Sequence, residues 1–208
     1  MLRKPLKLAD LAIEPSAEVL CAYDRPARCA YLANLAGTTP EAIYTAIWGT
    51  GFETSADAGA VDAQSYLRGY GERIGYPLTL DEWLAARRVS MTLRPQVLDL
   101  VRRVREKARV AVLTNNTTLV AEHIDRLLPE LRPLFGDAIY ASAGFKAAKP
   151  DPICFRRCLD VLSRTPGSTL FIDDLAENVA GAVEAGLFAH RYVSPEALAA
   201  ALRDHDLI

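Results

Sequence analysis

Hydrophobic and polar residues follow two different patterns along the chain, and the change falls near residue 90. From Thr92 onward, short apolar runs alternate with stretches in which apolar residues recur every three or four positions. This order is typical of strands alternating with helices, and it favours a parallel sheet with helices on both faces. The predicted strands are 109–113, 138–141, 169–172 and 188–193, and the predicted helices are 94–106, 119–128, 153–163, 177–185 and 195–202.

The segment from residue 22 to about residue 90 has only the helical pattern, because none of its apolar runs is typical of a buried strand. Thr39 and Thr79 are suited to cap helices that begin just after them. We therefore predict an α/β core formed by residues 1–21 and 91–208, and a small helical domain formed by residues 22–90. The four predicted helices of this domain are 25–35, 40–48, 62–74 and 80–88.

Composition narrows the classes of function. The chain has 208 residues, half of them hydrophobic, which is enough for one domain plus a modest insertion. Its formal charge of -2 gives no basic surface for nucleic acid. No apolar stretch approaches the roughly 20 residues of a membrane span, and residues 1–7 lack a signal peptide's apolar region, so we expect a cytoplasmic protein that does not enter a membrane.

The four cysteines are Cys21, Cys29, Cys154 and Cys158. They form no Cys-x-x-Cys motif. Buried free thiols are therefore expected rather than a zinc site or a disulfide.

Two adjacent acids, Asp173 and Asp174, follow the apolar run 170–172, at the carboxyl end of a predicted strand. Open α/β sheets bind ligands at that edge. Neighbouring carboxylates repel each other unless a cation, a lysine or hydrogen bonds offset their charge. One acid alone would suffice to cap the following helix, so the pair favours a metal site over capping.

Further polar residues are predicted at the same edge. Thr114, Asn115 and Asn116 follow the strand 109–113, and Lys149 stands between this strand and the acid pair, before Pro-Asp-Pro. Threonine and asparagine are also common turn formers, and an isolated lysine is most often solvated. Their occurrence beside the acid pair favours a functional role for Thr114 and Lys149, whereas Asn116 is expected to serve the turn.

Trp48, Phe52 and Glu53 have two interpretations. They could line the face of the helical domain over a substrate, but aromatic residues at helical spacing more often belong to a core, and we favour the core.

The motifs Thr114-Asn115-Asn116, Lys149-Pro150-Asp151-Pro152 and Asp173-Asp174 with Asn178 resemble, in order and spacing, the second to fourth motifs of the haloacid dehalogenase-like hydrolases. The resemblance covers nearly the whole chain, because this family also places a helical cap after its first strand. It implies a Rossmann-like sheet with helices on both faces and an inserted cap. Within the family, the chain looks most like small phosphatases that act on sugar phosphates.

The resemblance also implies roles for individual residues. Thr114 and Asn115 would contact the transferred phosphoryl group, Lys149 would neutralise phosphate and carboxylates, and Asp173 and Asp174 would hold Mg²⁺. These are the groups that electrostatic stabilisation of phosphoryl transfer requires. The implied function is Mg²⁺-dependent hydrolysis of a small phosphorylated metabolite through an aspartyl-phosphate, by a monomer or homodimer.

The family's first motif, an attacking Asp at the end of the first strand, is not matched. Aligning Val19-Leu20 with the passage into the cap places Pro15 at the nucleophile position and Ala17 at the usual second acid. Three explanations are open. Asp10 is the nucleophile, after a strand at 5–9 and a longer loop; Glu14 is a weaker substitute; or residues 1–18 derive from a wrongly assigned start or a reading-frame error.

The unmatched motif leaves two functions open: an active hydrolase, or a catalytically inactive relative with a binding or regulatory role, which Pro15 favours. Dehalogenase chemistry would need the same attacking Asp. The chain has no Gly-x-Ser-x-Gly, Gly-x-Gly-x-x-Gly or Walker motif, so esterase, dinucleotide and triphosphate functions are not supported.

Overall fold

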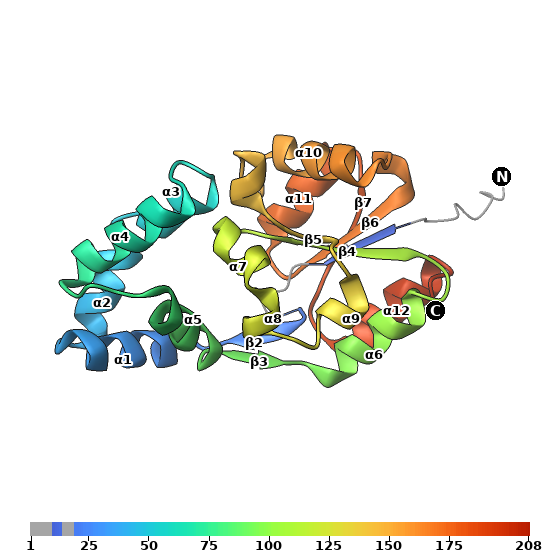
Figure 1. Ribbon diagram of the computed structural model, residues 1–208. Helices are drawn as coiled ribbons and strands as arrows, with labels where there is room; N and C mark the ends of the chain where they lie inside the picture. Colours follow the sequence, from blue (N-terminus) through green and yellow to red (C-terminus); the bar gives the residue numbers. More distant parts are fainter. Residues whose placement is uncertain (1–9, 14–18) are drawn as a thin grey trace.

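The central element of the fold is a five-stranded sheet in the order β5-β4-β1-β6-β7. The computed structural model describes residues 10–13 and 19–208 (Figure 1). All four strand pairings are parallel, and β1 lies in the middle. The chain therefore winds outward from β1 in both directions, and the carboxyl ends of β4 and β6 flank the point where the winding reverses. The strands are β1 (Asp10–Ile13), β4 (Arg109–Thr114), β5 (Ile139–Ala141), β6 (Thr169–Asp173) and β7 (Phe188–Arg191).

Helices cover both faces of this sheet (Figure 1). One face carries α10 (Pro152–Leu162) and α11 (Ala176–Glu184), and the other carries α6 (Pro95–Val104) and α12 (Pro195–Asp204). The predicted fold class is confirmed. We call the sheet and its covering helices the sheet part.

Alternating side chains of the strands supply both cores. Val112 and Ile172 belong to the hydrophobic cluster that contains α6 and α12, whereas Leu113 and Phe171 belong to the cluster of α10 and α11. Successive residues of a strand point to opposite faces, so a strand covered on both sides reads as one continuous apolar run. This is the pattern from which these strands were predicted.

The connections contain short helices that the sequence pattern missed or merged. The predicted helix 119–128 is two helices, α7 (Thr118–Glu122) and α8 (Ile124–Leu127), because His123 has a non-helical backbone (φ -114°, ψ 25°). The four-residue helix α9 (Arg132–Phe135) was not predicted. Two 3₁₀ turns, η1 (Ser142–Phe145) and η2 (Pro166–Ser168), complete the connections.

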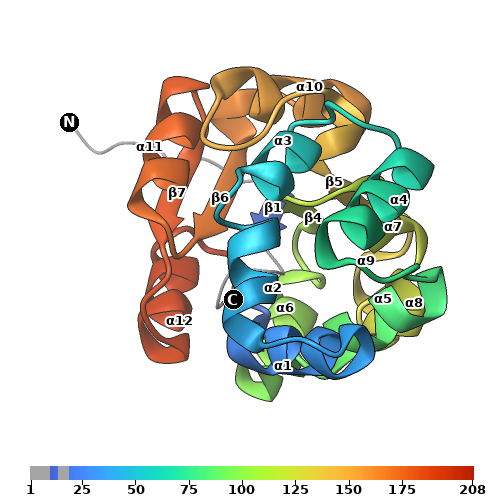
Figure 2. The same cartoon turned by 90° about the vertical axis from the view of Figure 1, so that its left-hand side faces the viewer.

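Five helices between β2 and β3 form a unit beside the sheet part, and in Figure 2 this unit lies in front of the sheet. Thr39 and Thr79 cap two of these helices through their side chains, as the sequence indicated. The short α3, which follows Gly51 in the left-handed conformation, was not predicted. We call these helices the helical unit: α1 (Arg25–Ala36), α2 (Pro40–Ile47), α3 (Phe52–Asp57), α4 (Ala63–Ile74) and α5 (Leu80–Arg88).

A two-stranded antiparallel ribbon joins the helical unit to the sheet part. It consists of β2 (Cys21–Tyr23) and β3 (Met91–Leu93), each three residues long. Strands this short leave no recognisable apolar run, so the sequence did not predict them. Within the described ranges, no helix has the length and apolarity that crossing a bilayer would need.

Candidate active site

Thr114 and Asp173 end β4 and β6, the two strands on either side of β1, and neither side chain is exposed. The register aligns Ile13, the last described residue of β1, with Val112 and Ile172. Both polar residues therefore lie beyond that point, at the edge of the sheet where the sequence placed them.

Lys149 reaches this edge from the loop before α10. Its Nζ donates to Asp173 Oδ2 over 2.9 Å and to the carbonyl oxygen of Leu113 over 3.1 Å. The side chains of Lys149 and Asp173 are both completely buried. Burial is the largest influence on Lys149 and lowers the pKa of its ammonium group, while the negative charge of Asp173 acts in the opposite direction. The ammonium is thus held by two oxygen acceptors inside the protein.

Asn115 holds the backbone of Lys149 in place. Asn115 Nδ2 donates to the Lys149 carbonyl oxygen over 2.8 Å, and the Lys149 amide donates to Asn115 Oδ1 over 2.9 Å. The resemblance implied contact between Asn115 and the substrate. Both ends of its side-chain amide bond to the backbone of Lys149, so the side chain positions the loop, and a contact of Asn115 with substrate stays a prediction.

Asp173 accepts hydrogen bonds at both oxygens. Oδ1 accepts from the Leu175 amide over 2.9 Å, Asn178 Nδ2 lies 3.0 Å from each oxygen, and Oδ2 also accepts from Lys149. A carboxylate offers about four lone-pair sites, and these four contacts use them. Asp173 therefore holds Lys149 and the start of α11, and the metal role expected of Asp173 and Asp174 stays a prediction.

Asp174 is half-buried and stands directly after β6. With Arg94 and Arg191 it lines a cavity of about 450 Å³, and Arg191 Nε donates to its backbone oxygen over 3.0 Å. Mg²⁺ is commonly held by one or two carboxylates together with water and phosphate oxygens, so the donor chemistry of Asp174 fits it. Among the residues the structure describes, no group of three or more acids, histidines or cysteines gathers around a metal position.

Asp10 lies at the wrong end of its strand for the expected role. It begins β1 and pairs with Arg109 and Thr169, the first residues of β4 and β6. Arg109 and Thr114 are five residues apart, which at about 3.3 Å per residue is roughly 16 Å. The register therefore argues against Asp10 as the attacking group. The predicted strand 5–9 and the other candidates of the first motif, Glu14, Pro15 and Ala17, lie outside the described residues.

A cleft of about 290 Å³ separates the helical unit from the sheet edge. Thr114, Lys149 and Asp173 do not line it, but their sequence neighbours do. The lining residues from the sheet part are Asn115, Asn116, Leu175 and Asn178, and those from the ribbon and helical unit are Tyr23, Arg25, Arg28, Trp48, Glu53, Thr54, Asp57 and Arg87.

Two hydrogen bonds join the walls of this cleft near α3. Ser142 Oγ donates to the backbone oxygen of Asp57 over 2.6 Å, and Lys146 Nζ donates to that of Gly59 over 3.0 Å. The helical unit is thereby fixed over the sheet edge.

We call the side of the cleft formed by the ribbon and the helical unit the helical wall. It contains charged residues that were not predicted from the sequence. Arg28 and Arg87 are buried, at 1% and 3% exposure, as is Glu53 at 7%. Arg28 shares the apolar face of α1 with Leu32, four residues later. The sequence signal for a buried charge here was an arginine at a position of the helix where apolar residues are expected. Of the three residues with two interpretations, Trp48 and Glu53 line the cleft, whereas Phe52 stacks on Tyr66 in the core.

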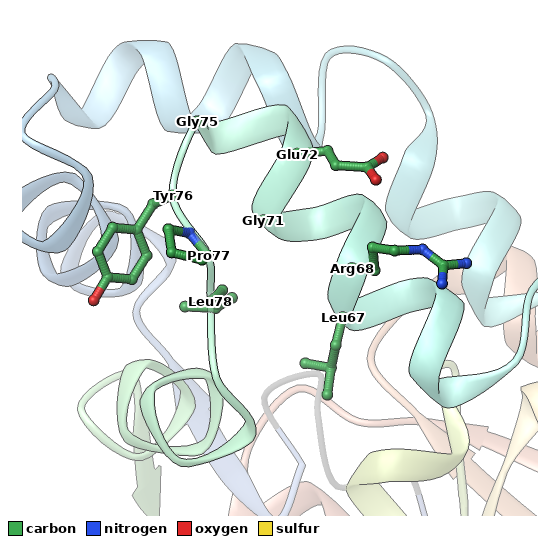
Figure 3. Close-up of a pocket in the computed structure, with 8 residues that line it drawn as sticks. All are labelled: Leu67, Arg68, Gly71, Glu72, Gly75, Tyr76, Pro77 and Leu78. Carbon is green, nitrogen blue, oxygen red and sulfur yellow. The ribbon is translucent and has the colours of Figure 1, made fainter.

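A second hollow lies at the end of α4, on a side formed only by the helical unit and its connections (Figure 3). It has a volume of about 510 Å³ and no residue of the sheet edge. Its lining residues are Leu67, Arg68, Gly71, Glu72, Gly75, Tyr76, Pro77 and Leu78. None of the buried charged residues in the described part of the chain lines this hollow.

Two curated phosphatases are similar to this chain in sequence. It is 37% identical over 86 residues to Phosphatase MT3486 of Mycobacterium tuberculosis (strain CDC 1551 / Oshkosh), covering 41% of this chain and 39% of that protein. It is 29% identical over 114 residues to the N-acylneuraminate-9-phosphatase of Rattus norvegicus, covering 54% of this chain and 45% of that protein. The chain thus spans less than half the length of these relatives.

Among solved structures, a haloacid dehalogenase family enzyme from Bacteroides thetaiotaomicron, in complex with magnesium and inorganic phosphate, has a TM-score of 0.75. It is 22% identical, and the match covers 89% of this chain and 94% of that one, which shows a common fold. The family model of the haloacid dehalogenase-like hydrolases matches residues 35–186, well over half of the chain. This chain therefore belongs to the haloacid dehalogenase-like hydrolase family.

Proposed function

We propose that this chain is a Mg²⁺-dependent phosphomonoesterase that acts on a small phosphorylated metabolite. The observation that carries the proposal is the buried ammonium of Lys149, which donates to Asp173 at the sheet edge, while Asn115, next to Thr114, holds the backbone of Lys149. The phosphatase relatives, and the magnesium and phosphate in the similar bacterial structure, support the same function.

The residues at the edge suit phosphoryl transfer. A transferred phosphoryl group carries charge on its equatorial oxygens, and fixed donors stabilise that charge. The Thr114 hydroxyl would donate to one oxygen, and Lys149 would supply positive charge. Magnesium held by Asp174 would offset the charge of the phosphoryl oxygens.

Because the family's attacking Asp stands at the end of its first strand, we place the attacking group of this chain at the end of β1. Among the described residues, no acid occupies that end, and Glu14 is the carboxylate that follows Ile13 in the sequence. We assign the attack to Glu14. Its oxygen would bond to phosphorus as the ester oxygen leaves and takes a proton, and water would then hydrolyse the acyl phosphate to release inorganic phosphate.

The helical unit acts in this proposal as a cap. It lies over the sheet edge, and hydrogen bonds from Ser142 and Lys146 hold it there. Such a cover limits water around the reacting phosphate and leaves the substrate's other end in contact with α1, α3 and α5. A cytoplasmic location and a monomeric or homodimeric state remain predictions from the sequence.

Hydrolysis of p-nitrophenyl phosphate, with and without Mg²⁺, tests the proposal. We expect Mg²⁺-dependent release of phosphate by the parent chain. Thr114→Val should lower kcat about 10²-fold, since one fixed donor is lost. Glu14→Gln should abolish turnover, whereas Asp10→Asn should retain it.

Two outcomes would change these assignments. Release no greater than in a control without protein would reject the enzyme and favour the inactive relative that Pro15 suggests. Loss of activity in Asp10→Asn, with a normal melting temperature, would reject the assignment of attack to Glu14.

A further inference from the structure

We propose that Arg87 and Arg28 form an anion subsite in the cleft, which binds a carboxylate at the end of the substrate remote from the phosphoryl group. The subsite lies in the helical wall, opposite the sheet edge. This inference rests on the proposed function for the phosphoryl end of the substrate. It narrows the substrate class to small phosphorylated carboxylic acids.

Arg87 is a buried cation that lacks a partner within the described part of the chain. It lies in the last turn of α5, is 3% exposed and lines the cleft. Its guanidinium lies over the Trp83 ring, 4.6 Å from the centroid, but it makes no hydrogen bond or ion pair with the described residues, and its Nε is buried. A buried charge without a hydrogen-bonding partner costs free energy. A ligand anion in the cleft would supply that partner.

Arg28 stands nearby with part of its bonding capacity unused. One terminal nitrogen donates to the Tyr23 hydroxyl over 2.9 Å. The other lies 3.5 Å from Glu53 Oε1 as an ion pair, and neither this nitrogen nor Nε has a hydrogen-bond acceptor. The guanidinium lies over the rings of Trp48 and Trp83, at 5.3 and 5.8 Å from their centroids. Arg28 and Arg87 thus share Trp83 as a common aromatic support.

Two acids, Glu53 and Asp57, accompany the arginines in the helical wall. Glu53 pairs with Arg28 and also accepts from the Tyr66 hydroxyl over 2.9 Å. Asp57 makes no ion pair with the described residues, and its Oδ1 is buried without a donor. Burial, followed by the nearby charge of Glu53, raises the pKa of Asp57 well above its usual range, against the opposite effect of the positive charges of Arg87 and Arg28. Among the described residues the ion pair of this wall is the one between Arg28 and Glu53, so the guanidinium of Arg87 is left without a paired acid, which suits a carboxylate.

The cleft lies between the arginines and the sequence neighbours of the residues at the sheet edge. Arg28 and Arg87 line one side, and Asn115 and Asn116, the neighbours of Thr114, line the other. The volume of about 290 Å³ is that of a small-metabolite site. A compound of few carbon atoms would fit between these two walls.

Two ligands that differ in one group provide the test: 3-phosphoglycerate and glycerol 3-phosphate, in which a hydroxymethyl group replaces the carboxylate. Binding would be measured by calorimetry without Mg²⁺, so that hydrolysis does not contribute. The parent should bind the carboxylate ligand at least about tenfold more tightly, as expected for a charge-assisted contact. Arg87→Gln should remove this preference, and Arg87→Lys should restore part of it.

The control is Arg88→Gln, which removes an exposed arginine from the same helix end and should leave the preference unchanged. Melting temperatures provide a second readout. Removing a buried cation that lacks a partner should not lower the melting temperature of Arg87→Gln, whereas removing an arginine with a structural role would lower it.

Equal affinity of the parent for the two ligands, or no binding of either at 10 mM, would overturn the subsite. A preference that persists in Arg87→Gln would overturn it as well. p-Nitrophenyl phosphate has no carboxylate, so its hydrolysis reports the proposed function separately. If the parent hydrolyses p-nitrophenyl phosphate but shows no carboxylate preference, only the subsite is rejected. If it shows the preference but does not hydrolyse p-nitrophenyl phosphate, only the enzymatic function is rejected.

Discussion

The side-chain amide of Asn115 forms two hydrogen bonds with the backbone of Lys149, which lies 34 residues later in the chain. The backbone amide and the backbone carbonyl of Lys149 both form these hydrogen bonds, so the loop before α10 is fixed in position and direction against the end of β4. With the backbone of Lys149 held in place, its side chain extends to Asp173, to which the ammonium donates a hydrogen bond. One asparagine thus links two motifs that lie far apart in the sequence.

Replacing Asn115 by alanine should loosen this link. Asn115→Ala leaves the amide and carbonyl of Lys149 without their partners, which should cost about 1–3 kcal/mol of unfolding free energy. Hydrolysis of p-nitrophenyl phosphate should fall by at least tenfold, since Lys149 loses its fixed position. Urea unfolding and steady-state kinetics measure the two effects.

Asn34→Ala is the matched control, because Asn34 is exposed in α1. It should leave both stability and activity near the parent values, since alanine favours a helix more than asparagine. If Asn34→Ala and Asn115→Ala had the same stability and activity, the two hydrogen bonds between Asn115 and Lys149 would not hold the loop.

The buried pair of Lys149 and Asp173 should show strong coupling in a double-mutant cycle. Removing one partner leaves the other charge buried, so Lys149→Met and Asp173→Asn should each cost about 3–5 kcal/mol. The double variant should cost less than the sum of the two, because no unpaired charge remains. Urea unfolding of the four proteins measures the coupling.

The exposed pair of Arg126 and Asp81 offers the comparison. Its atoms are 2.7 Å apart, but its side chains are 50% and 80% exposed. The same cycle there should give less than about 1 kcal/mol. If the coupling free energy of Lys149 and Asp173 were no larger than that of Arg126 and Asp81, burial would not be what strengthens the buried pair.

The architecture of the sheet part was predictable because its strands are buried on both faces. The run that ends at Leu113 and the one that ends at Ile172 are continuous apolar segments, a pattern that few other structures produce. The ribbon strand that contains Cys21 was not predictable, since its three residues depend on pairing with residues 91–93. Pairing over such a sequence distance leaves no local periodicity.

The site was predictable in part, for a similar reason. Thr114 and Asp173 follow directly from strand ends, which a parallel sheet gathers at one edge. Asp10 was misplaced because its position depends on where β1 begins, and a short strand without a clear apolar run does not reveal that. Arg87 was missed because its burial depends on the cleft, which segments far apart in the sequence form together. Trp83, four residues earlier on α5, was the local signal.

Gly181 lets α11 approach the Lys149 loop, and a side chain there should push the two apart. A Cβ atom at this position would lie 1.9 Å from the carbonyl oxygen of Pro150. Because that atom belongs to the backbone, Gly181→Ala should cost at least about 1–3 kcal/mol and lower the activity. Thermal unfolding and p-nitrophenyl phosphate hydrolysis check both effects.

Gly167→Ala is the control for this change. No atom lies within 4 Å of a Cβ atom built at Gly167, and the residue is exposed. It should leave the melting temperature near the parent value. If Gly181→Ala were as stable and active as Gly167→Ala, the backbone at Pro150 would be able to move away from α11 without loss of stability.

Asp57 should make the stability of the protein depend on pH in an unusual direction. Burial and the charge of Glu53 raise its pKa above the ordinary value of 3.8, so the folded state holds the proton more tightly than the unfolded chain. The resulting stabilisation is complete below pH 3.8 and is lost as the pH rises toward the folded-state pKa. Asp57→Asn resembles the protonated form at every pH, so its melting temperature relative to the parent should increase from pH 5 upward.

Asp62→Asn should behave differently in the same series of buffers. The backbone hydrogen bond from Ser65 lowers the pKa of Asp62, so this carboxylate is ionised in both states above pH 5 and stabilises the start of α4 throughout. Its melting temperature should differ from that of the parent by a constant amount from pH 5 to pH 8, and by little, since asparagine also caps helices well. A constant difference for Asp57→Asn as well would mean that Asp57 remains ionised in the cleft and that Arg87 already has its counter-charge.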